Sequence, residues 1–379
     1  MTPASAPKVL DGSVLEGGGQ LLRNSMTLAA LTGKPISINN IRGRRNPPGL
    51  RNQHAAGLRL VADIASGVLE GARNGSSEID FIPRDIQLGD YLADPGTAGS
   101  TTLLLQVSLP CLIFAPMSGI GPNGSKPSTL TLRGGTNASH APPIDYTQHV
   151  FLPFIGRHFG LSPDINVRKR GYYPKGGGEV VVTVPAVTGP LPAVTLTTRG
   201  AVRQVRGRAY VAGVLPILVA NKMRDAATAA LLKHPGISPE MIEIECVKEN
   251  EADAVGTGSG IVLWCETTEG CVLGGSALGA KSVNAKKVGE SAAAELVRNL
   301  EHGGCVDEYL QDQIVIFMAL AEGVSTVSAG PLTMHTRTAI WVAEQLTEAK
   351  FEVNESDPAK TTIKCIGIGY RSPTSGQMS

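Results

Sequence analysis

The sequence is poor in features that mark several common protein classes. Only 4% of its 379 residues are aromatic, and 34 Lys and Arg against 33 Asp and Glu leave a formal net charge of +1. A protein that coats long nucleic acid needs a large excess of basic residues. This balance therefore limits any contact with nucleic acid to a local site.

Paired cysteines and long apolar runs are also missing. The six cysteines form no CxxC pair and no metal-type grouping with the seven histidines, so we expect reduced thiols and an intracellular protein. The N-terminal segment has no signal or transit pattern, and no later run approaches the length of a membrane span. We expect a soluble protein that is not secreted and has no membrane partner.

Several catalytic motifs are absent as well. The Gly-rich segments 16–19 and 274–282 do not match a phosphate-binding P-loop, which needs Gly directly before Lys. There is no GxSxG nucleophile elbow and no HExxH or other metal-ligand spacing. A P-loop ATPase is therefore disfavoured.

The 45 Gly and 25 Pro residues favour an α/β protein with many short connections. Periodicity and turn residues predict strands at 8–10 and 36–41, helices at 20–31 and through 55–62, then a helix ending near 109, a strand at 129–133, a helix at 150–159 and strands near 165 and 180. The similarity of 15–20 (LEGGGQ) to 174–179 (PKGGGE) indicates duplicated units.

The chain is long enough for more than one core, and its texture changes near residue 188. The part from 188 to 303 predicts strands at 194–198, 206–211, 243–247 and 261–266 with two alanine-rich helices. We interpret 188–303 as a smaller inserted α/β domain between two parts of a large domain, 1–187 and 304–379. The last part predicts helices at 306–321 and 336–349 around a strand near 325.

His335 is the first candidate for chemistry. It precedes a predicted helix whose N-cap we expect to be Thr336, so it should lie at a positive helix end. That field disfavours imidazolium, and free N–H groups can hold a phosphate beside a neutral nucleophilic nitrogen. From local sequence alone, a polar residue that only closes a strand-to-helix turn is the commoner explanation.

A second candidate lies in the predicted helix 306–321. Tyr309, Asp312 and Gln313 are spaced i, i+3 and i+4 and should share one face. A phenol ring can stack on a base, while the carboxylate and amide can form hydrogen bonds. A solvated helix face explains the same residues.

Arginines cluster around the Pro-Pro-Gly segment 47–49. They are Arg42, Arg44, Arg45 and Arg51, with Arg23 on the first predicted helix. Guanidinium groups match phosphate oxygens, although a solvated basic loop is the commoner explanation. Nearby Glu16 precedes three glycines, which suits a carboxylate that holds Mg²⁺ against a phosphate or, more simply, a tight turn.

Seven ordered blocks resemble the RNA 3'-terminal phosphate cyclase family along nearly the whole chain. They are EGGGQLLR (16–23, preceded by Asp11 and Gly12), IRGRRNPPGLRNQH (41–54), GTAGSTTLLLQVSLP (96–110), RGGTNASHAPPIDY (133–146), RGYYPKGGGEV (170–180), DEYLQDQ (307–313) and MHTRTAI (334–340). The resemblance implies a large domain of repeated βαβαββ units, similar to the C-terminal domain of a bacterial translation initiation factor, with a smaller α/β insertion.

The resemblance also implies a reaction in which a histidine attacks the α-phosphate of ATP, AMP passes to an RNA 3'-phosphate, and the neighbouring 2'-hydroxyl displaces AMP to leave a 2',3'-cyclic phosphate. Mg²⁺ or Mn²⁺ assists. His335 would be the adenylylated nucleophile and Glu16 the metal ligand. The residues that would bind phosphates or the RNA end are Arg23, Arg42, Arg45, Gln53 and Gln106. Tyr309 and Pro142 would enclose adenine, with Asp312 and Gln313 beside them.

One segment departs from the family pattern, because 117–128 is longer than the usual connection and should form an exposed loop. Two alternatives stay open. A cyclase-like ribosome-biogenesis factor has the fold but lacks the nucleophile, and His335 argues against it. An enolpyruvyl transferase would need neither the histidine nor the tyrosine. The resemblance suggests the nucleus or the cytoplasm, and no obligatory protein partner is evident.

Overall fold

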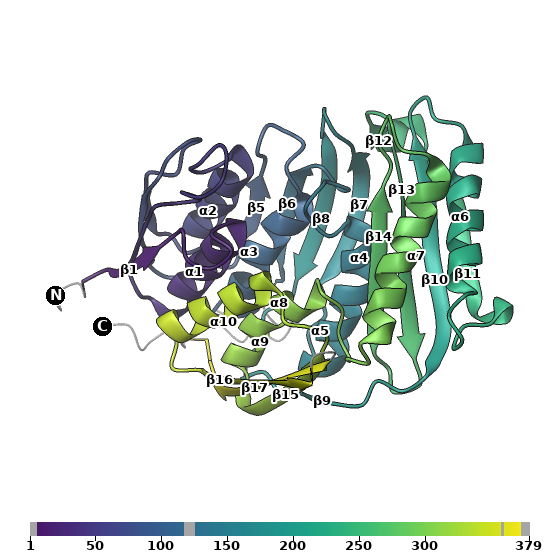
Figure 1. Ribbon diagram of the computed structural model, residues 1–379. Helices are drawn as coiled ribbons and strands as arrows, with labels where there is room; N and C mark the ends of the chain where they lie inside the picture. Colours follow the sequence, from purple (N-terminus) through teal and green to yellow (C-terminus); the bar gives the residue numbers. More distant parts are fainter. Residues whose placement is uncertain (1–5, 117–125, 358–359, 373–379) are drawn as a thin grey trace.

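The chain folds into four β-sheets and a set of helices that pack between and on them (Figure 1). A computed structural model describes residues 6–116, 126–357 and 360–372. The predicted loop at 117–128 falls mostly outside these residues, which resume at 126 and enter a strand at Ser128. The α/β fold class is confirmed.

The first unit has the element order βαβαββ. Its elements are β1 (Lys8–Asp11), α1 (Gly19–Thr32), β2 (Ile36–Asn39), α2 (Asn52–Ile64), β3 (Val68–Glu70) and β4 (Ile79–Ile82). The sheet order is β1-β2-β4-β3, with β1 and β2 parallel and the other pairs antiparallel.

The second unit repeats this order. Its elements are β5 (Asp90–Ala93), α3 (Thr101–Ile113), β6 (Ser128–Gly134), a helical segment made of α4 (Ile144–Tyr146), η1 (Thr147–Phe151) and α5 (Leu152–Phe159), then β7 (Asp164–Gly171) and β8 (Gly178–Val184). The sheet runs β5-β6-β8-β7, and a short strand, β12 (Ala254–Val255), extends it beside β7.

A third unit has the same topology but is interrupted after its first strand. It consists of β9 (Thr195–Leu196), α8 (Leu310–Gln313), α9 (Val315–Leu320), β15 (Glu322–Ala329), α10 (Met334–Leu346), β16 (Lys350–Asp357) and β17 (Lys360–Ile368). Its sheet order is β9-β15-β17-β16, again with only the first pair parallel. The same strand order thus occurs in each of three sheets.

The interruption forms a fourth sheet with its own helices. It contains β10 (Val202–Ala212), α6 (Ile217–Leu231), η2 (Pro239–Met241), β11 (Ile242–Lys248), η3 (Glu251–Asp253), β13 (Gly258–Thr267), β14 (Val272–Leu278) and α7 (Ala285–Glu301). The sheet order is β11-β10-β13-β14, and α6 and α7 pack on each other and on this sheet (Figure 1). We call residues 202–301 the inserted sheet-and-helix unit.

The predicted domain boundaries at 188 and 303 stay a prediction, but one strand inside them was misplaced. The predicted strand 194–198 is reduced to β9, which pairs with β15 of the third unit through Thr195 and Thr326. A parallel partner that follows it by more than a hundred residues leaves no local signal in the sequence.

One prediction about the last part of the chain is wrong, and two strands there were not predicted. The helix 306–321 is divided into α8 and α9 at Ile314, because side chains from Leu310 to Leu320 are buried almost all round and tertiary packing decides the backbone path. The strands that were not predicted are β16 and β17, although 350–354 alternates between exposed and partly buried side chains.

The helices of the three βαβαββ units pack against one another. Helix α1 contacts α2, α3 and α10, and α10 contacts α8 (Figure 1). Helix α1 is buried at Leu21, Leu22, Met26 and Leu28, so it is a central element of the core. Residues that begin these helices are therefore brought together from distant parts of the sequence.

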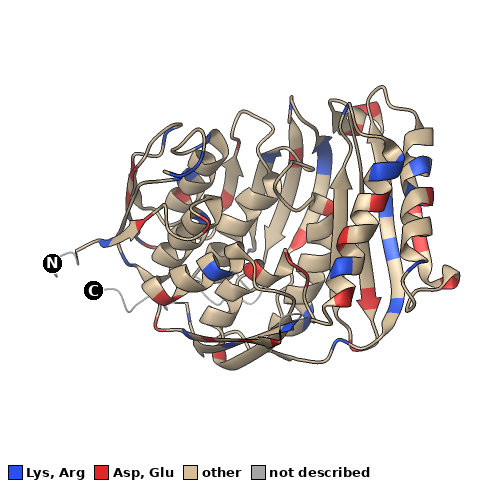
Figure 2. Cartoon of the chain, in the orientation of Figure 1, with Lys and Arg blue, Asp and Glu red and all other residues tan. Residues whose placement is uncertain are grey.

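Charged side chains of both signs are interspersed along the chain (Figure 2). On β10, Arg203 and Arg206 lie beside Glu266, at 2.5 Å and 3.3 Å. Among the described helices, none is long and apolar enough to span a bilayer.

Candidate active site

His335 lies in the first turn of α10. The helix begins at Met334, and the side chain of Thr333 accepts a hydrogen bond from the Thr336 N–H at 3.1 Å. Thr333 is therefore the N-cap, and the prediction of Thr336 is wrong. From sequence alone, either Thr333 or Thr336 could be the N-cap. In the structure it is Thr333, because its backbone is extended (φ −75°, ψ 157°) as an N-cap requires.

A buried glutamine holds this helix start in place. The Gln311 side-chain oxygen accepts hydrogen bonds from the Thr333 N–H at 3.0 Å and the Thr336 hydroxyl at 2.6 Å. Its amide group donates to the carbonyl oxygens of Gly330 and Pro331 at 3.3 and 3.4 Å. Gln311 thus fixes the loop that carries His335, a role that the sequence analysis missed.

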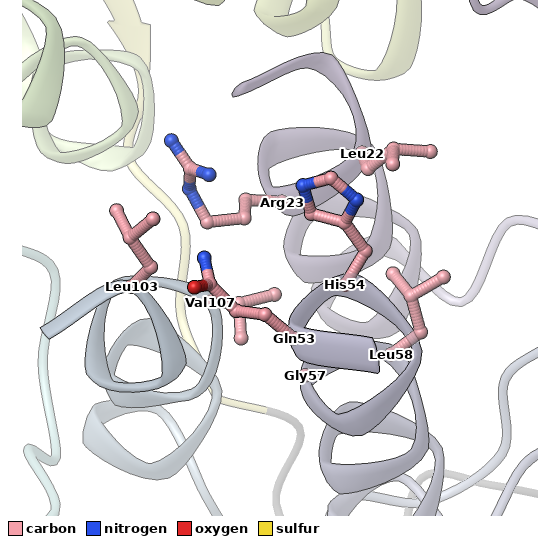
Figure 3. Close-up of a pocket in the computed structure, with 8 residues that line it drawn as sticks. All are labelled: Leu22, Arg23, Gln53, His54, Gly57, Leu58, Leu103 and Val107. Atoms are coloured by element: carbon pink, nitrogen blue, oxygen red, sulfur yellow. The ribbon is translucent and has the colours of Figure 1, made fainter. Parts of the chain in front are cut away.

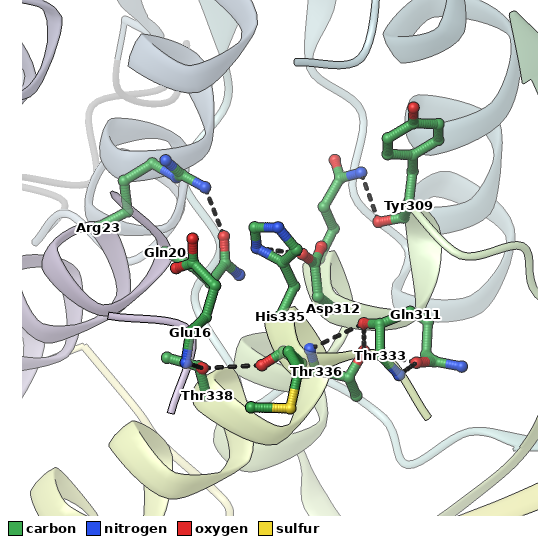
Figure 4. Close-up of polar contacts among 12 residues, drawn as sticks. Glu16, Gln20, Arg23, Tyr309, Gln311, Asp312, Thr333, His335, Thr336 and Thr338 are labelled. Carbon is green, nitrogen blue, oxygen red and sulfur yellow. Dashed lines mark hydrogen bonds and ion pairs between the residues drawn. The ribbon is translucent and has the colours of Figure 1, made fainter. Parts of the chain in front are cut away.

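The side chain of His335 borders a cavity of about 240 Å³ between the three units. The wall comes from α1, α3, the loop after β6, the start of α8 and the loop before α10, and Figure 4 shows part of it. The lining residues are Arg23, Leu103, Gln106, His140, Pro142, Glu308, Tyr309, Asp312, Gln313, Thr333 and His335. Seven predicted site residues therefore line one cavity: Arg23, Gln106, Pro142, Tyr309, Asp312, Gln313 and His335.

His335 faces Asp312 across this cavity. Its Nδ1 lies 3.9 Å from the Asp312 Oδ2, and half of the His335 side chain (51%) is exposed. Burial lowers the pKa of His335, with the guanidinium groups of Arg23 and Arg45 acting in the same direction and Glu16 opposing them. Burial raises the pKa of Asp312 to about 7, against the attraction of Arg23. The imidazole is thus mainly neutral at neutral pH, which a nucleophile requires.

Glu16 approaches the same place from the turn before α1. Its backbone N–H donates to the Thr338 hydroxyl of α10 at 3.3 Å, which ties this turn to the His335 helix (Figure 4). One carboxylate oxygen pairs with Arg45 at 2.5 Å. The other oxygen, Oε2, is buried without a hydrogen-bond partner among the described residues.

This carboxylate fits a site for Mg²⁺ or Mn²⁺ that a bound phosphate completes. Mg²⁺ is usually held by one or two carboxylates together with substrate phosphates and water, and the unpartnered Oε2 of Glu16 is a suitable ligand atom. No group of three His, Cys, Asp or Glu side chains in the described ranges is placed to form a metal site by itself. Glu16 would therefore hold the metal only in combination with a substrate.

Arg23 connects this site to a small neighbouring cavity. Figure 3 shows Gln53 and His54 from α2 beside Arg23 from α1. Burial and the nearby Arg23 lower the pKa of His54 to about 3, so this histidine is uncharged. A Cβ at Gly19 would come within 2.8 Å of the His54 ring and 2.9 Å of the Arg23 guanidinium, so a larger residue here would make these side chains shift.

The remaining predicted phosphate ligands lie outside the cavity wall. The Arg42 guanidinium donates to the carbonyl oxygens of Pro47 and Gly49, at 3.1 and 2.9 Å, and so shapes its own loop. The Gln53 side-chain oxygen accepts from the Ser100 N–H at 2.8 Å. Of this group, Arg45 comes nearest to the cavity, through its contact with Glu16.

His140 is a further lining residue that the sequence analysis missed. It lies on the loop after β6, has an exposed side chain and adopts a positive φ of 61°. Nothing in its local sequence distinguishes it, since its place in the wall follows from the loop that also carries Pro142.

Known proteins are similar to this sequence over nearly its whole length. Residues 14–353 match the sequence profile of the family described as "RNA 3'-terminal phosphate cyclase". The chain is 41% identical to the RNA 3'-terminal phosphate cyclase of Drosophila melanogaster, with 95% of this chain and 96% of that protein covered. It is 40% identical to the protein of that name from Pyrobaculum neutrophilum, with 95% and 99% covered. A probable RNA 3'-terminal phosphate cyclase from Dictyostelium discoideum is also 40% identical, with 95% and 83% covered. The chain therefore belongs to the RNA 3'-terminal phosphate cyclase family, a family of ligase-type enzymes.

Proposed function

We propose that this protein uses ATP to convert an RNA 3'-terminal phosphate to a 2',3'-cyclic phosphate, through a covalent AMP on His335. The observation that carries the proposal is the position of His335 in the first turn of α10, on the wall of a cavity shared with Tyr309, Asp312 and Arg23. A neutral imidazole, a positive helix end and a guanidinium group meet there. This combination suits nucleophilic attack on a phosphate.

The cavity offers distinct surfaces for the parts of ATP. Tyr309 and Pro142 both line the cavity and can provide flat surfaces for adenine, and Gln106 and Gln313 can bond with its edge or with the ribose. Arg23 is placed for the phosphates. Apart from the Thr336 N–H, which Thr333 caps, the N–H groups in the first turn of α10 have no acceptor within the helix and can bond to an anion.

In the first step, an imidazole nitrogen of His335 attacks the α-phosphorus of ATP. A P–N bond forms, the bond from that phosphorus to the bridging oxygen breaks, and pyrophosphate leaves. Because Nδ1 faces Asp312 at 3.9 Å, Nε2 is the nitrogen free to attack. The proton on Nδ1 stays on the ring, and the Asp312 carboxylate can hold the resulting cationic imidazole as the pair closes on substrate.

A divalent metal held by Glu16 would supply positive charge to the phosphate oxygens. Glu16 itself is oriented by Arg45 and by the contact of its backbone with Thr338. The second carboxylate oxygen, Oε2, has no hydrogen-bond partner among the described residues and could serve as the metal ligand.

In the second and third steps, AMP moves to the RNA and is then expelled. An oxygen of the RNA 3'-phosphate attacks the phosphorus on His335, the P–N bond breaks, and the imidazole is regenerated. The 2'-hydroxyl then attacks the 3'-phosphorus, loses its proton to solvent and releases AMP. AMP is needed because a phosphate monoester has no good leaving group, and the adjacent hydroxyl provides a high effective concentration. We place the RNA phosphate near Arg45, with Arg42 and Gln53 shaping that side.

The test uses an RNA oligonucleotide with a labelled 3'-phosphate. With ATP and Mg²⁺, the label should become resistant to phosphatase, and the His335→Ala variant should leave it sensitive. ATP-independent binding of RNA with no resistant label in the wild type would instead favour a binding factor built on the same fold.

We also propose that the three βαβαββ units resemble the C-terminal domain of a translation initiation factor. The recurrence of one strand order in three sheets supports this inference. For the location we propose the nucleus or cytoplasm.

A further inference from the structure

Asp307 precedes Tyr309 by two residues and is completely buried. Its Oδ1 accepts hydrogen bonds from the N–H groups of Tyr309 and Leu310, at 3.0 and 2.8 Å, so the side chain closes the turn that begins α8. These bonds fix the backbone from which the Tyr309 ring extends. A buried carboxylate with several donors is an expensive feature to keep in a protein interior unless it holds something in place.

A second buried tyrosine completes this arrangement. The Tyr146 hydroxyl donates to Asp307 at 2.6 Å, and its ring meets the Tyr309 ring edge to face, with centroids 5.6 Å apart and an interplanar angle of 71°. Tyr146 belongs to the second unit, whereas Asp307 and Tyr309 precede α8 of the third. The Tyr309 ring is thus held by two kinds of contact: the hydrogen bond from its backbone N–H to Asp307 and the packing of its ring against Tyr146.

The inserted sheet-and-helix unit supplies the remaining contact. The other Asp307 oxygen accepts from the Gly274 N–H of β14 at 2.7 Å, and the Gly274 carbonyl accepts from the buried Asn299 of α7 at 3.1 Å. A Cβ at position 274 would lie 2.5 Å from the Tyr146 ring, so only glycine permits this approach. The inserted unit therefore contacts Asp307 and Tyr146, the two residues that hold Tyr309.

Several arginines of the inserted unit are paired with acidic side chains. Arg203 and Arg206 of β10 pair with Glu266, and Arg208 pairs with Glu249 at 2.9 Å. At the end of α7, Arg298 pairs with Glu308, the residue before Tyr309, at 2.6 Å. The inserted unit thus makes a second contact beside Tyr309.

We propose that Asp307 and Tyr146 are positioning residues for the base of ATP. They hold Tyr309 in the orientation that stacks on adenine, and the inserted unit serves the reaction by fixing Asp307 through Gly274. This inference rests on the proposed function, because Tyr309 must be an adenine platform. It assigns a role to the inserted unit that requires no contact with RNA.

The test measures adenylylation of His335 as a function of ATP concentration. Tyr146→Phe removes only the hydroxyl and should raise the half-saturating ATP concentration about 3- to 10-fold, while the rate at saturating ATP changes little. Asp307→Asn should raise it by about tenfold or more, since one oxygen acceptor is lost. The matched control is Tyr210→Phe, because Tyr210 is equally buried and its hydroxyl has no hydrogen-bond partner among the described residues.

A double-mutant cycle separates positioning from general stability. In a Tyr309→Ala background, Asp307→Asn should produce no further rise in the half-saturating ATP concentration, because its effect passes through the ring that is gone. An equal rise in both backgrounds, or no rise in either, would overturn the inference. Normal labelling of the wild type with unchanged variants would sink this inference alone. A wild type that takes no label would remove the proposed function and the inference together.

Discussion

The Nδ1 atom of His335 lies 3.9 Å from the Oδ2 atom of Asp312, so the proposed nucleophile faces a carboxyl group just beyond hydrogen-bonding distance. Burial lowers the pKa of the histidine and raises that of the carboxyl to about 7. Around neutral pH the imidazole is therefore mainly neutral and the carboxyl group is about half ionised. The imidazole therefore carries no positive charge before it attacks and gains one only when the bond to phosphorus forms.

The raised pKa of Asp312 predicts a pH-dependent cost in stability. Its pKa rises on folding from 3.8 to about 7, so the folded state binds the proton more tightly. The stabilisation of the folded state by this bound proton is complete below pH 4 and is lost as pH rises through 7. Between pH 5 and pH 7 the loss of unfolding free energy amounts to about 2–3 kcal/mol. Relative to the wild type, Asp312→Asn should thus become more stable by this amount as pH rises.

Thermal or urea unfolding of both proteins at pH 5 and pH 8 measures this difference. The comparison cancels the other buried carboxyl groups, such as Asp307, because they occur in both proteins. A stability difference that stays constant across this range would show that Asp312 does not carry the shifted titration.

Removal of the N-cap of α10 should affect both stability and chemistry. Thr333→Ala leaves the Thr336 N–H without its acceptor and should cost about 1 kcal/mol of unfolding free energy. Because His335 lies in the same turn, the rate of labelling from ATP should also fall, by about tenfold or more.

The matched control is Asn284→Ala, which removes the side-chain cap of α7 at Lys286. It should cost a similar free energy, measured by urea unfolding, while labelling stays at the wild-type rate. If both variants label at the same rate per folded molecule, the helix start does not position the nucleophile.

Substitution of Glu16 should change the dependence on divalent metal. Glu16→Gln keeps a partner for Arg45 but removes the charge of the buried carboxylate. We expect the half-saturating Mg²⁺ concentration for labelling to rise by at least about tenfold, equivalent to about 1.4 kcal/mol of binding free energy. The matched control, Asp11→Asn, alters an exposed carboxylate that accepts hydrogen bonds from Ser13 in its own turn. An unchanged Mg²⁺ titration for Glu16→Gln would exclude this carboxylate as the metal ligand.

Much of the fold could be predicted from local pattern. The helices α1 and α2 and the strands before them follow from apolar periodicity and from the glycine after α1. The change of texture after residue 188 accompanies the separate sheet of β10, β11, β13 and β14. The division between α8 and α9 could not be predicted, because almost every side chain there is buried and periodicity no longer distinguishes faces.

The site shows a similar limit. Tyr309, Asp312 and His335 were selected from helix spacing, helix ends and family resemblance, and they do line one cavity. Asp307 and Gln311 were not selected, although they lie in the same segment. Asp307 binds Tyr146 of the second unit, whereas Gln311 binds Thr333 in the loop before α10 of its own unit. No spacing in the sequence indicates hydrogen bonds between segments that are 161 and 22 residues apart.

The most direct test of the central claim is covalent labelling with ATP that carries the label in its α-phosphate. In the presence of Mg²⁺, the wild type should retain acid-labile label, peptide mapping should place it on His335, and His335→Ala should retain none. Label that persists in His335→Ala, or a folded wild type that binds ATP but takes no label, would contradict the account.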